Sequence, residues 1–381
     1  MHTAGVVAAL LAAGMAVLVA LALPPGYDFR AYWLAAQHLL DGGPLYPGPG
    51  VHLGLSGGFR YAPLIAVPFL VFTPLSFEIA RWIWIALLIV VATVVARSGI
   101  RTLPWAARPW AAAGVVVFLP LVLEVVLGNL NLLTLALCLV AWRWRDRAPI
   151  GGPVLALAVG LKLLPAALLL FYVGTRRWRL LGWTAATGAI GLAITAAVMP
   201  DRLAEYLRFA PRLLEQDWVF EVIDRPRPEW LAAIFWNDAF PNVLAIVVAI
   251  GAFVAGRASR SGGERATTLH HITLATMGYL APFGYFWTTF LILTLPLFGD
   301  VLRRSLALES TRSRVAAVSV VVLCWGLIQV QQLRDLVPIL AHLTGATLLV
   351  TLALVLLGSS ARAQIEGRSM SRSRAKATAS S

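Results

Sequence analysis

The sequence predicts an all-α, polytopic integral membrane protein. Of its 381 residues, 59% are hydrophobic and only 13% are charged, which leaves too little polar surface to cover a soluble globule. Apolar stretches close to the length of a bilayer-spanning helix, about 20 residues, recur along the chain. Arginine-rich clusters separate many of these stretches, and the positive-inside rule places the clusters in the cytoplasm. Membrane orientation therefore explains the net charge of +13, which does not indicate nucleic-acid binding.

The arginine clusters determine how often the chain crosses the membrane. The chain must return to the cytoplasmic side between successive clusters, which predicts about twelve transmembrane segments with both termini in the cytoplasm. The clusters lie at 97–108, 143–147, 176–179, 257–265, 303–314 and 362–376. The predicted segments are 5–23, 76–96, 110–127, 129–142, 150–161, 163–175, 180–199, 239–256, 268–281, 284–300, 315–332 and 336–357.

Two of these regions, 150–175 and 268–300, are each too long for one span and short for two. We interpret each as a hairpin of short helices that is broken at a proline, Pro165 or Pro282. Proline at membrane depth is tolerated where the freed carbonyl groups face protein or a wet cavity. The two breaks therefore indicate a cavity that opens on the outer side of the membrane.

The segments form one predicted transmembrane domain, residues 1–358, followed by a basic, Ser-rich cytoplasmic tail, 359–381, whose composition predicts disorder. Two longer loops, 24–75 and 200–236, fall on the outer side. The first is predicted to contain an amphipathic helix in the membrane interface that ends at Asp41-Gly42. The second has charges of both signs and three tryptophans, which predict a folded cap on the membrane surface. The apolar face of the predicted helix consists of Phe29, Tyr32, Trp33, Ala36, Leu39 and Leu40.

Asp28 lies at the start of that helix, where the chain first meets water after an apolar stretch. One interpretation is a helix N-cap, a position that Asp favours. The other is a general base that activates a hydroxyl group at the membrane surface. The two are compatible, because a carboxylate at a helix start also remains ionised.

Lys162 carries a positive charge in an otherwise apolar hairpin, at a cost of roughly 2.5–3.5 kcal/mol on insertion scales. Its side chain either extends to the interface or contacts the phosphate of an anionic lipid. Arg30, Arg60 and Arg81 are further candidates for phosphate contacts, although Arg60 has the alternative role of an aromatic-belt anchor. Glu124 lies within a predicted span and is interpreted as a counter-ion for these cations or as a second catalytic carboxylate.

The run Gly128-Asn129-Leu130-Asn131 separates two predicted segments. It is either only the turn of a helical hairpin, or it also directs the amides of Asn129 and Asn131 into the cavity as hydrogen-bond partners for a sugar. The sequence has no phosphate-binding loop, dinucleotide fingerprint, nucleophile elbow or Cys/His metal spacing. His270 and His271 are adjacent and would point in different directions on a helix, so no metal site is predicted. An enzyme with this sequence would need a donor substrate already in the membrane.

Five short motifs occur between residues 28 and 165: Asp28-x-x-x-Tyr32, Gly43-x-x-Tyr46, Tyr61-x-Pro63, Gly128-Asn129-x-Asn131 and Lys162-x-x-Pro165. Taken together, they resemble glycosyltransferase family 87, a family of GT-C-type membrane mannosyltransferases that depend on polyprenyl-phosphate-mannose. The resemblance covers residues 1 to about 300. It implies a GT-C-like fold, with Asp28 as the catalytic base and with Tyr32, Tyr61, Asn131 and Lys162 lining the donor and acceptor cavity.

The chain also departs from the family pattern. Asn129 stands where members usually have Gln, so the amide is kept on a shorter side chain. Tyr285 and Trp287 stand in the places of a Ser-Pro…Trp-x-His stretch, and no histidine follows.

The resemblance implies transfer of a mannosyl residue from polyprenyl-phosphate-mannose to a cell-envelope glycolipid or lipoglycan at the outer face of the membrane. The chemistry needs a base for the acceptor hydroxyl and cations for the departing phosphate, so we expect an inverting, metal-independent displacement that gives an α linkage and uses no cofactor. Alternatives are a donor carrying another sugar such as arabinose, a flippase or transporter of a lipid-linked sugar, and an inactive scaffold, which would fit the absent histidine.

Overall fold

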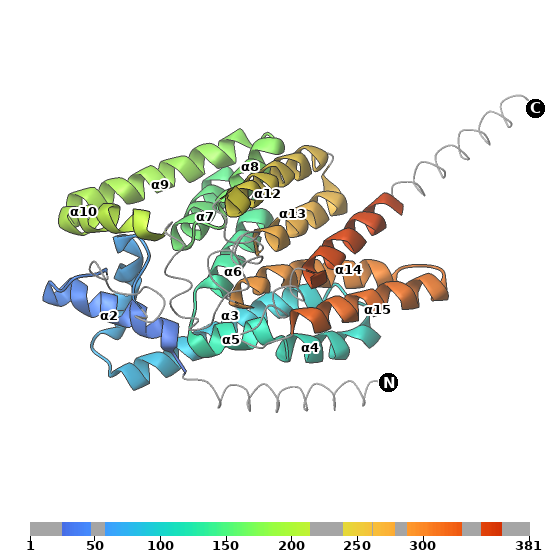
Figure 1. The fold of residues 1–381 in the computed structure, drawn as a ribbon, viewed down its shortest axis with the longest axis horizontal. Helices are drawn as coiled ribbons and strands as arrows, with labels where there is room; N and C mark the ends of the chain where they lie inside the picture. The colour runs from blue at the N-terminus through green and yellow to red at the C-terminus, as the bar shows by residue number, and fades with distance from the viewer. Residues whose placement is uncertain are drawn as a thin grey trace, which may run out of the picture.

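The computed structural model describes residues 25–46, 58–213, 239–260, 262–278, 288–329 and 344–359. Within these ranges every regular element is helical, which confirms the predicted all-α class (Figure 1). The α-helices are α2 (Tyr27–Asp41), α3 (Phe77–Ile100), α4 (Arg108–Val116), α5 (Leu119–Leu127), α6 (Asn131–Arg143), α7 (Ala148–Leu161), α8 (Ala166–Gly174), α9 (Trp178–Val198), α10 (Pro200–Phe209), α12 (Ala239–Ala258), α13 (Gly263–Met277), α14 (Leu295–Leu306) and α15 (Thr311–Ile328). A further helix is Thr344–Ser359, and the 3₁₀ helices are η1 (Pro63–Phe72), η2 (Trp105–Ala107), η3 (Ala210–Leu213) and η6 (Thr288–Thr294).

Three of the described helices, α3, α9 and α15, are long and apolar enough to cross a membrane, and a bent pair of helices that ends with α5 makes up to four. The chain is therefore a plausible polytopic membrane protein. The count of about twelve segments stays a prediction, because the other apolar helices are shorter than a full span.

The segment predicted as one span at 110–127 is instead bent by 50° between α4 and α5. Pro120 lies in the first turn of α5, and it cannot donate the backbone hydrogen bond that would continue α4. The side chain of Gln329 satisfies the groups freed at the bend. Its Oε1 accepts from the backbone N–H of Leu119 at 2.7 Å, and its Nε2 donates to the carbonyl of Val117 at 3.1 Å. The predicted segment 110–127 therefore consists of two helices that meet at a bend.

The structure also tests the predicted break at Pro165 and the predicted amphipathic helix. The break at Pro165 is confirmed, since α7 ends at Leu161 and α8 begins at Ala166. The amphipathic helix is confirmed as α2, which ends before Gly42 in the left-handed region, φ 74°. Leu40, at the end of its predicted apolar face, is 62% exposed and packs less against the protein than the other residues of that face. The segment 5–23, the loop beyond 213, Pro282 and most of the tail lie outside the described residues.

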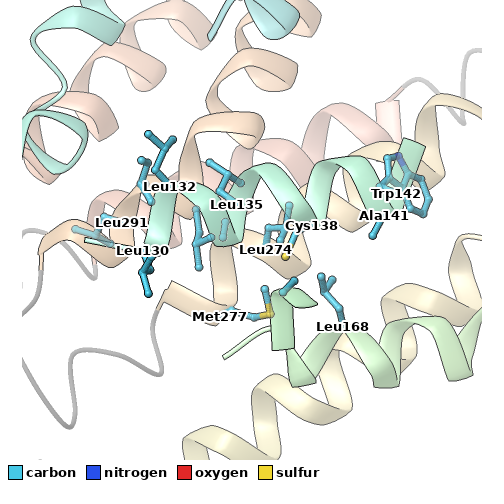
Figure 2. Close-up of a cluster of buried hydrophobic side chains, with 14 of the residues drawn as sticks. Leu130, Leu132, Leu135, Cys138, Ala141, Trp142, Leu168, Leu274, Met277 and Leu291 are labelled. Carbon is cyan, nitrogen blue, oxygen red and sulfur yellow. The ribbon is translucent and has the colours of Figure 1, made fainter. Parts of the chain in front are cut away.

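The core is built around α6, whose side chains at 132, 135, 138 and 141 are fully buried. This spacing of about three residues puts one apolar stripe on one helix face. Figure 2 shows that stripe against Leu168 of α8, Leu274 and Met277 of α13, and Leu291 of η6. Cys138 lies within this stripe, and both Cys138 and Cys324 are free and buried, as expected for small core residues.

Helices α8 and α12 approach so closely that only glycine fits between them. A Cβ atom on Gly256 would lie 2.1 Å from the carbonyl oxygen of Phe171, and one on Gly174 would lie 2.3 Å from that of Phe253. Small residues at such crossings let helix backbones pack in a membrane.

Replacement of Gly256 by Val is expected to lower the free energy of unfolding by about 1–3 kcal/mol, because the added carbon atoms collide with the α8 backbone. Thermal unfolding of the purified protein in detergent measures the effect. The matched control is Gly251→Val on the same helix, where nothing lies within 4 Å of an added Cβ. Equal unfolding temperatures for the two variants would contradict the packing described here.

The antiparallel run of α6, α7 and α8 gives the bundle two distinct ends. The turns at 128–130 and 162–165 lie at one end, which we call the Asp28 end, and the turns at 144–147 and 175–177 lie at the other, the arginine end. Helix α9 then leads to α10 at the Asp28 end (Figure 1). There Glu205 accepts hydrogen bonds from the backbone N–H groups of Leu45 and Tyr46 at 2.9 and 3.1 Å. The two predicted outer loops therefore meet at one end.

Candidate active site

Asp28 is positioned by the way in which α2 begins. Gly26 is the N-cap of α2, with φ 75°, and its N–H donates to the carbonyl of Val126 at 2.7 Å. A Cβ on Gly26 would lie 2.5 Å from Cγ of Arg81, so the close approach requires glycine. Asp28 lies in the first turn, and the N-cap makes no side-chain hydrogen bond. The N-cap interpretation of Asp28 is therefore wrong, and its carboxylate is directed elsewhere.

The carboxylate of Asp28 is the first member of a chain of three polar side chains. Its Oδ2 accepts a hydrogen bond from Nδ2 of Asn129 at 2.7 Å. The other amide atom of Asn129, Oδ1, accepts from Nζ of Lys162 at 3.0 Å. The ammonium also lies 4.4 Å from the centre of the Phe290 ring, a cation–π contact that lowers the cost of placing a charge there. One amide thus connects a carboxylate with a cation.

Asn129 is held in this orientation by a tight turn. Gly128 ends α5 with φ 75°, and its carbonyl accepts from Nε1 of Trp84 at 2.9 Å. A Cβ on Gly128 would lie 2.9 Å from Cβ of Phe29, so α2 and α5 touch at this point. The run 128–131 is therefore the predicted hairpin turn and also directs the Asn129 amide toward Asp28.

Glu124 is fully buried and caps the start of α6. Its Oε1 accepts from the backbone N–H of Leu132 at 2.7 Å, and its Oε2 accepts from Nδ2 of Asn131 at 3.0 Å. A carboxylate at a helix N-terminus satisfies free N–H groups and interacts with the helix dipole. Among the described residues it makes no ion pair within 4 Å. Glu124 thus holds the turn, and its charge also acts on Lys162, as expected of the predicted counter-ion.

Tyrosines from the first of the two predicted outer loops lie close to the same site. The hydroxyl oxygens of Tyr32 and Tyr61 lie 3.2 Å apart, and the Tyr46 hydroxyl donates to the carbonyl of Tyr61 at 2.8 Å. Burial above all raises the pKa of Tyr32 and of Tyr61, and the negative charge of Asp28 adds to the shift. Both phenols therefore stay protonated and can hydrogen-bond to a ligand.

The surroundings make Asp28 a stronger base than an ordinary aspartate. Loss of solvent raises the pKa of this carboxyl, and the Asn129 hydrogen bond and the charges of Lys162 and Arg60 offset the shift only in part. A raised pKa suits a general base, because the proton that it must accept is then held more tightly. Arg60 is thus close enough to act on Asp28 through its charge.

Two of the predicted phosphate contacts are not brought to this cluster. Arg81 pairs with Glu78, lies over the ring of Trp82 at 5.1 Å and packs under Gly26. Arg30 is exposed, and its side chain makes no hydrogen bond or ion pair with the described residues. Their roles in substrate binding stay predictions.

The sequence did not indicate two residues that contact the site, Phe290 and Trp84, because they carry no motif that sets them apart from other apolar residues.

No group of three potential metal ligands exists among the described residues. His270 is fully buried and stacks on Trp142 with ring centres 4.4 Å apart, as a core side chain would. The chemistry that the site supports is proton abstraction by Asp28 beside a cation that can stabilise an anionic group.

Comparison with known proteins agrees with this site. Residues 59–282 match glycosyltransferase family 87, and the chain belongs to that family. It is 30% identical over 204 residues to the polyprenol-phosphate-mannose-dependent alpha-(1-2)-phosphatidylinositol mannoside mannosyltransferase of Mycolicibacterium smegmatis (strain ATCC 700084 / mc(2)155). The aligned part covers 48% of this chain and 46% of that relative, so the match spans about half the length of each. No solved structure matches the chain.

Proposed function

We propose that this protein transfers a mannosyl residue from polyprenyl-phosphate-mannose to a cell-envelope glycolipid or lipoglycan at the outer face of the membrane. The observation that carries the proposal is the Asp28–Asn129–Lys162 chain, which puts a base and a cation at one site. Membership of the family and the donor named for the relative support it.

The reaction is a single displacement at the anomeric carbon of the donor. Asp28 accepts the proton of an acceptor hydroxyl group as that oxygen attacks the anomeric carbon, and the bond from this carbon to the phosphate oxygen breaks. The electron pair leaves with the polyprenyl phosphate, whose charge Lys162 and Arg60 stabilise. Attack from the opposite face converts a β-linked donor into an α-linked product. The scheme uses no metal and no cofactor.

The acceptor of the relative is a phosphatidylinositol mannoside, and a glycolipid of this class is the first acceptor that we would offer to this chain. Tyr32, Tyr61 and Asn131 lie beside Asp28 or in the adjoining turn, where their polar groups can hydrogen-bond to sugar hydroxyl groups. A donor that carries arabinose would fit the same base and cation.

Sugar transfer by the purified protein in lipid tests the proposal. The donor is radiolabelled polyprenyl-phosphate-mannose, and the acceptor is a cell-envelope lipid extract. We expect label to appear in a new, larger glycolipid. No transfer by folded protein from mannose or arabinose donors, together with movement of the intact donor across vesicles, would overturn the transferase in favour of a flippase.

A further inference from the structure

A small cavity lies at the arginine end of the bundle, at the opposite end of α6 from Asn129. Its volume is about 60 Å³, large enough for about two water molecules or for one phosphate group. Arg145, Arg177 and Arg260 line it, together with Thr175 and Ser259. The walls come from the ends of α6, α8 and α12 and from the first turn of α13.

The cavity has more positive charge than its acidic neighbour can neutralise. Asp146, whose side chain is 69% exposed, pairs with Arg177 at 2.5 Å and lies 3.9 Å from Arg145. Arg260 has no carboxylate partner among the described residues; its Nε donates to the carbonyl of Gly174 at 2.9 Å. The charges of two further arginines, Arg176 and Arg257, act on Arg260. An anion would therefore be attracted here.

Capping of helix C-termini alone does not account for these arginines. Arg145 donates to the carbonyl of Trp142 at 2.8 Å, and Arg177 donates to that of Arg145 at 3.2 Å. Each such bond uses one N–H of a guanidinium group that has five. Donors therefore remain for an anion, and a guanidinium group matches the geometry of a phosphate.

The first turn of α13 adds to the attraction. Gly262 and Ala266 line the cavity, so the positive end of the α13 dipole faces it. Glu264, the acidic residue in that turn, forms ion pairs with Arg303 at 2.9 Å and with Arg304 at 3.7 Å. Its negative charge is thus balanced by these two arginines of α14.

The turn that follows α8 contains an arginine in a strained backbone conformation. Arg176 has φ 59°, a left-handed conformation that glycine usually adopts at this point of a helix end. The N–H groups of Arg176 and Arg177 close the turn on the carbonyls of Val173 and Tyr172, both at 3.0 Å. The turn directs Arg177 into the cavity, and strained residues of this kind are found at ligand sites.

The surface beside the cavity is typical of a membrane interface. Trp178, the residue after Arg177, and Trp183, further along α9, are 61% and 48% exposed, as tryptophans at the level of lipid headgroups are. The cavity is too small for more than a phosphate group, so acyl chains would lie outside along the apolar helices. Basic pockets between membrane helices bind such headgroups. We propose that this cavity binds the phosphate of an anionic phospholipid, in the cytoplasmic leaflet if the arginine end faces the cytoplasm.

Native mass spectrometry of the full-length protein in neutral detergent tests the site, with phosphatidylglycerol titrated against phosphatidylcholine. We expect preferential binding of phosphatidylglycerol, and a loss of about tenfold or more in its affinity in Arg260→Gln, because a charge-assisted hydrogen bond is removed. The matched control is Arg179→Gln, which removes the same charge from a residue at the same end that is exposed, as Arg260 is, but does not line the cavity. Thermal unfolding without lipid confirms that the variants fold.

Three results would overturn the proposal. Equal binding of the two lipids, which both carry a phosphate, would show that the net negative charge of an anionic phospholipid is not recognised. An equal loss in Arg179→Gln and Arg260→Gln would show a diffuse attraction instead of a built site. Inorganic phosphate that stabilises the protein as well as phosphatidylglycerol does would assign the cavity to a free anion. None of these outcomes depends on whether the protein transfers a sugar.

Discussion

Asp28→Asn is expected to lower sugar transfer by roughly 10²–10⁴-fold, the usual contribution of a general base. Asn has the same shape as Asp but cannot accept the proton of the acceptor hydroxyl. It still offers an oxygen to Nδ2 of Asn129, which now donates to Asp28 at 2.7 Å, so the fold should persist. Initial rates of transfer, together with unfolding temperature, measure both effects.

The control for this substitution is Asp41→Asn, which removes a carboxylate from the last residue of the same helix. We expect it to transfer at the normal rate. Nearly normal turnover by Asp28→Asn would refute the assignment of the base, and an unfolded Asp28→Asn protein would move the role of Asp28 from chemistry to structure.

The pH dependence of the same assay provides a second readout for Asp28. Only the ionised carboxylate accepts a proton, so the rate should fall as the pH is lowered through its pKa, which burial raises. The hydrogen bond from Asn129 lowers that pKa. Asn129→Leu should therefore move the acid limb of the pH–rate profile to higher pH, and a limb that stays in place would show that another group limits the rate.

Local signals in the sequence were sufficient for the elements that lie next to each other along the chain. Apolar spacing and Gly42 predict α2 and its end, because a glycine adopts the left-handed conformation there at no steric cost. Gly128 similarly predicts the turn after α5. Pro165 marks the break between α7 and α8, because proline removes a helical hydrogen bond.

Contacts between distant segments could not be predicted in this way. Asn129 is 101 residues from Asp28 and 33 from Lys162, and only the packing of α2 against the α5–α6 turn sets their register. The sequence offers Glu124 as a counter-ion or catalytic carboxylate and Asn131 as a sugar-binding amide, but it does not show that the two side chains bind each other at the start of α6. Gln329, which stabilises the bend between α4 and α5, has no local signal at all.

Lys162→Met is the other substitution with a large expected effect, a fall in kcat of about 10²–10³-fold, as for loss of one preorganised charge at a transition state. Met keeps the length and the apolar stem, so contact with Phe290 can persist while the charge is lost. Steady-state kinetics of mannosyl transfer measure the change. Lys162→Arg should recover part of the rate, because it restores a cation in the same place.

The pH profile distinguishes the two ways in which Lys162 can act. Its charge lowers the pKa of Asp28, so Lys162→Met should also move the acid limb to higher pH. Comparison well above that limb, where Asp28 is ionised in both proteins, removes this indirect effect. A defect in kcat that persists there, with an unchanged KM for the acceptor, is the result expected of a cation that stabilises the departing phosphate. A defect that disappears at high pH would mean that Lys162 acts only through Asp28, and Arg60 would then be the remaining candidate for the phosphate.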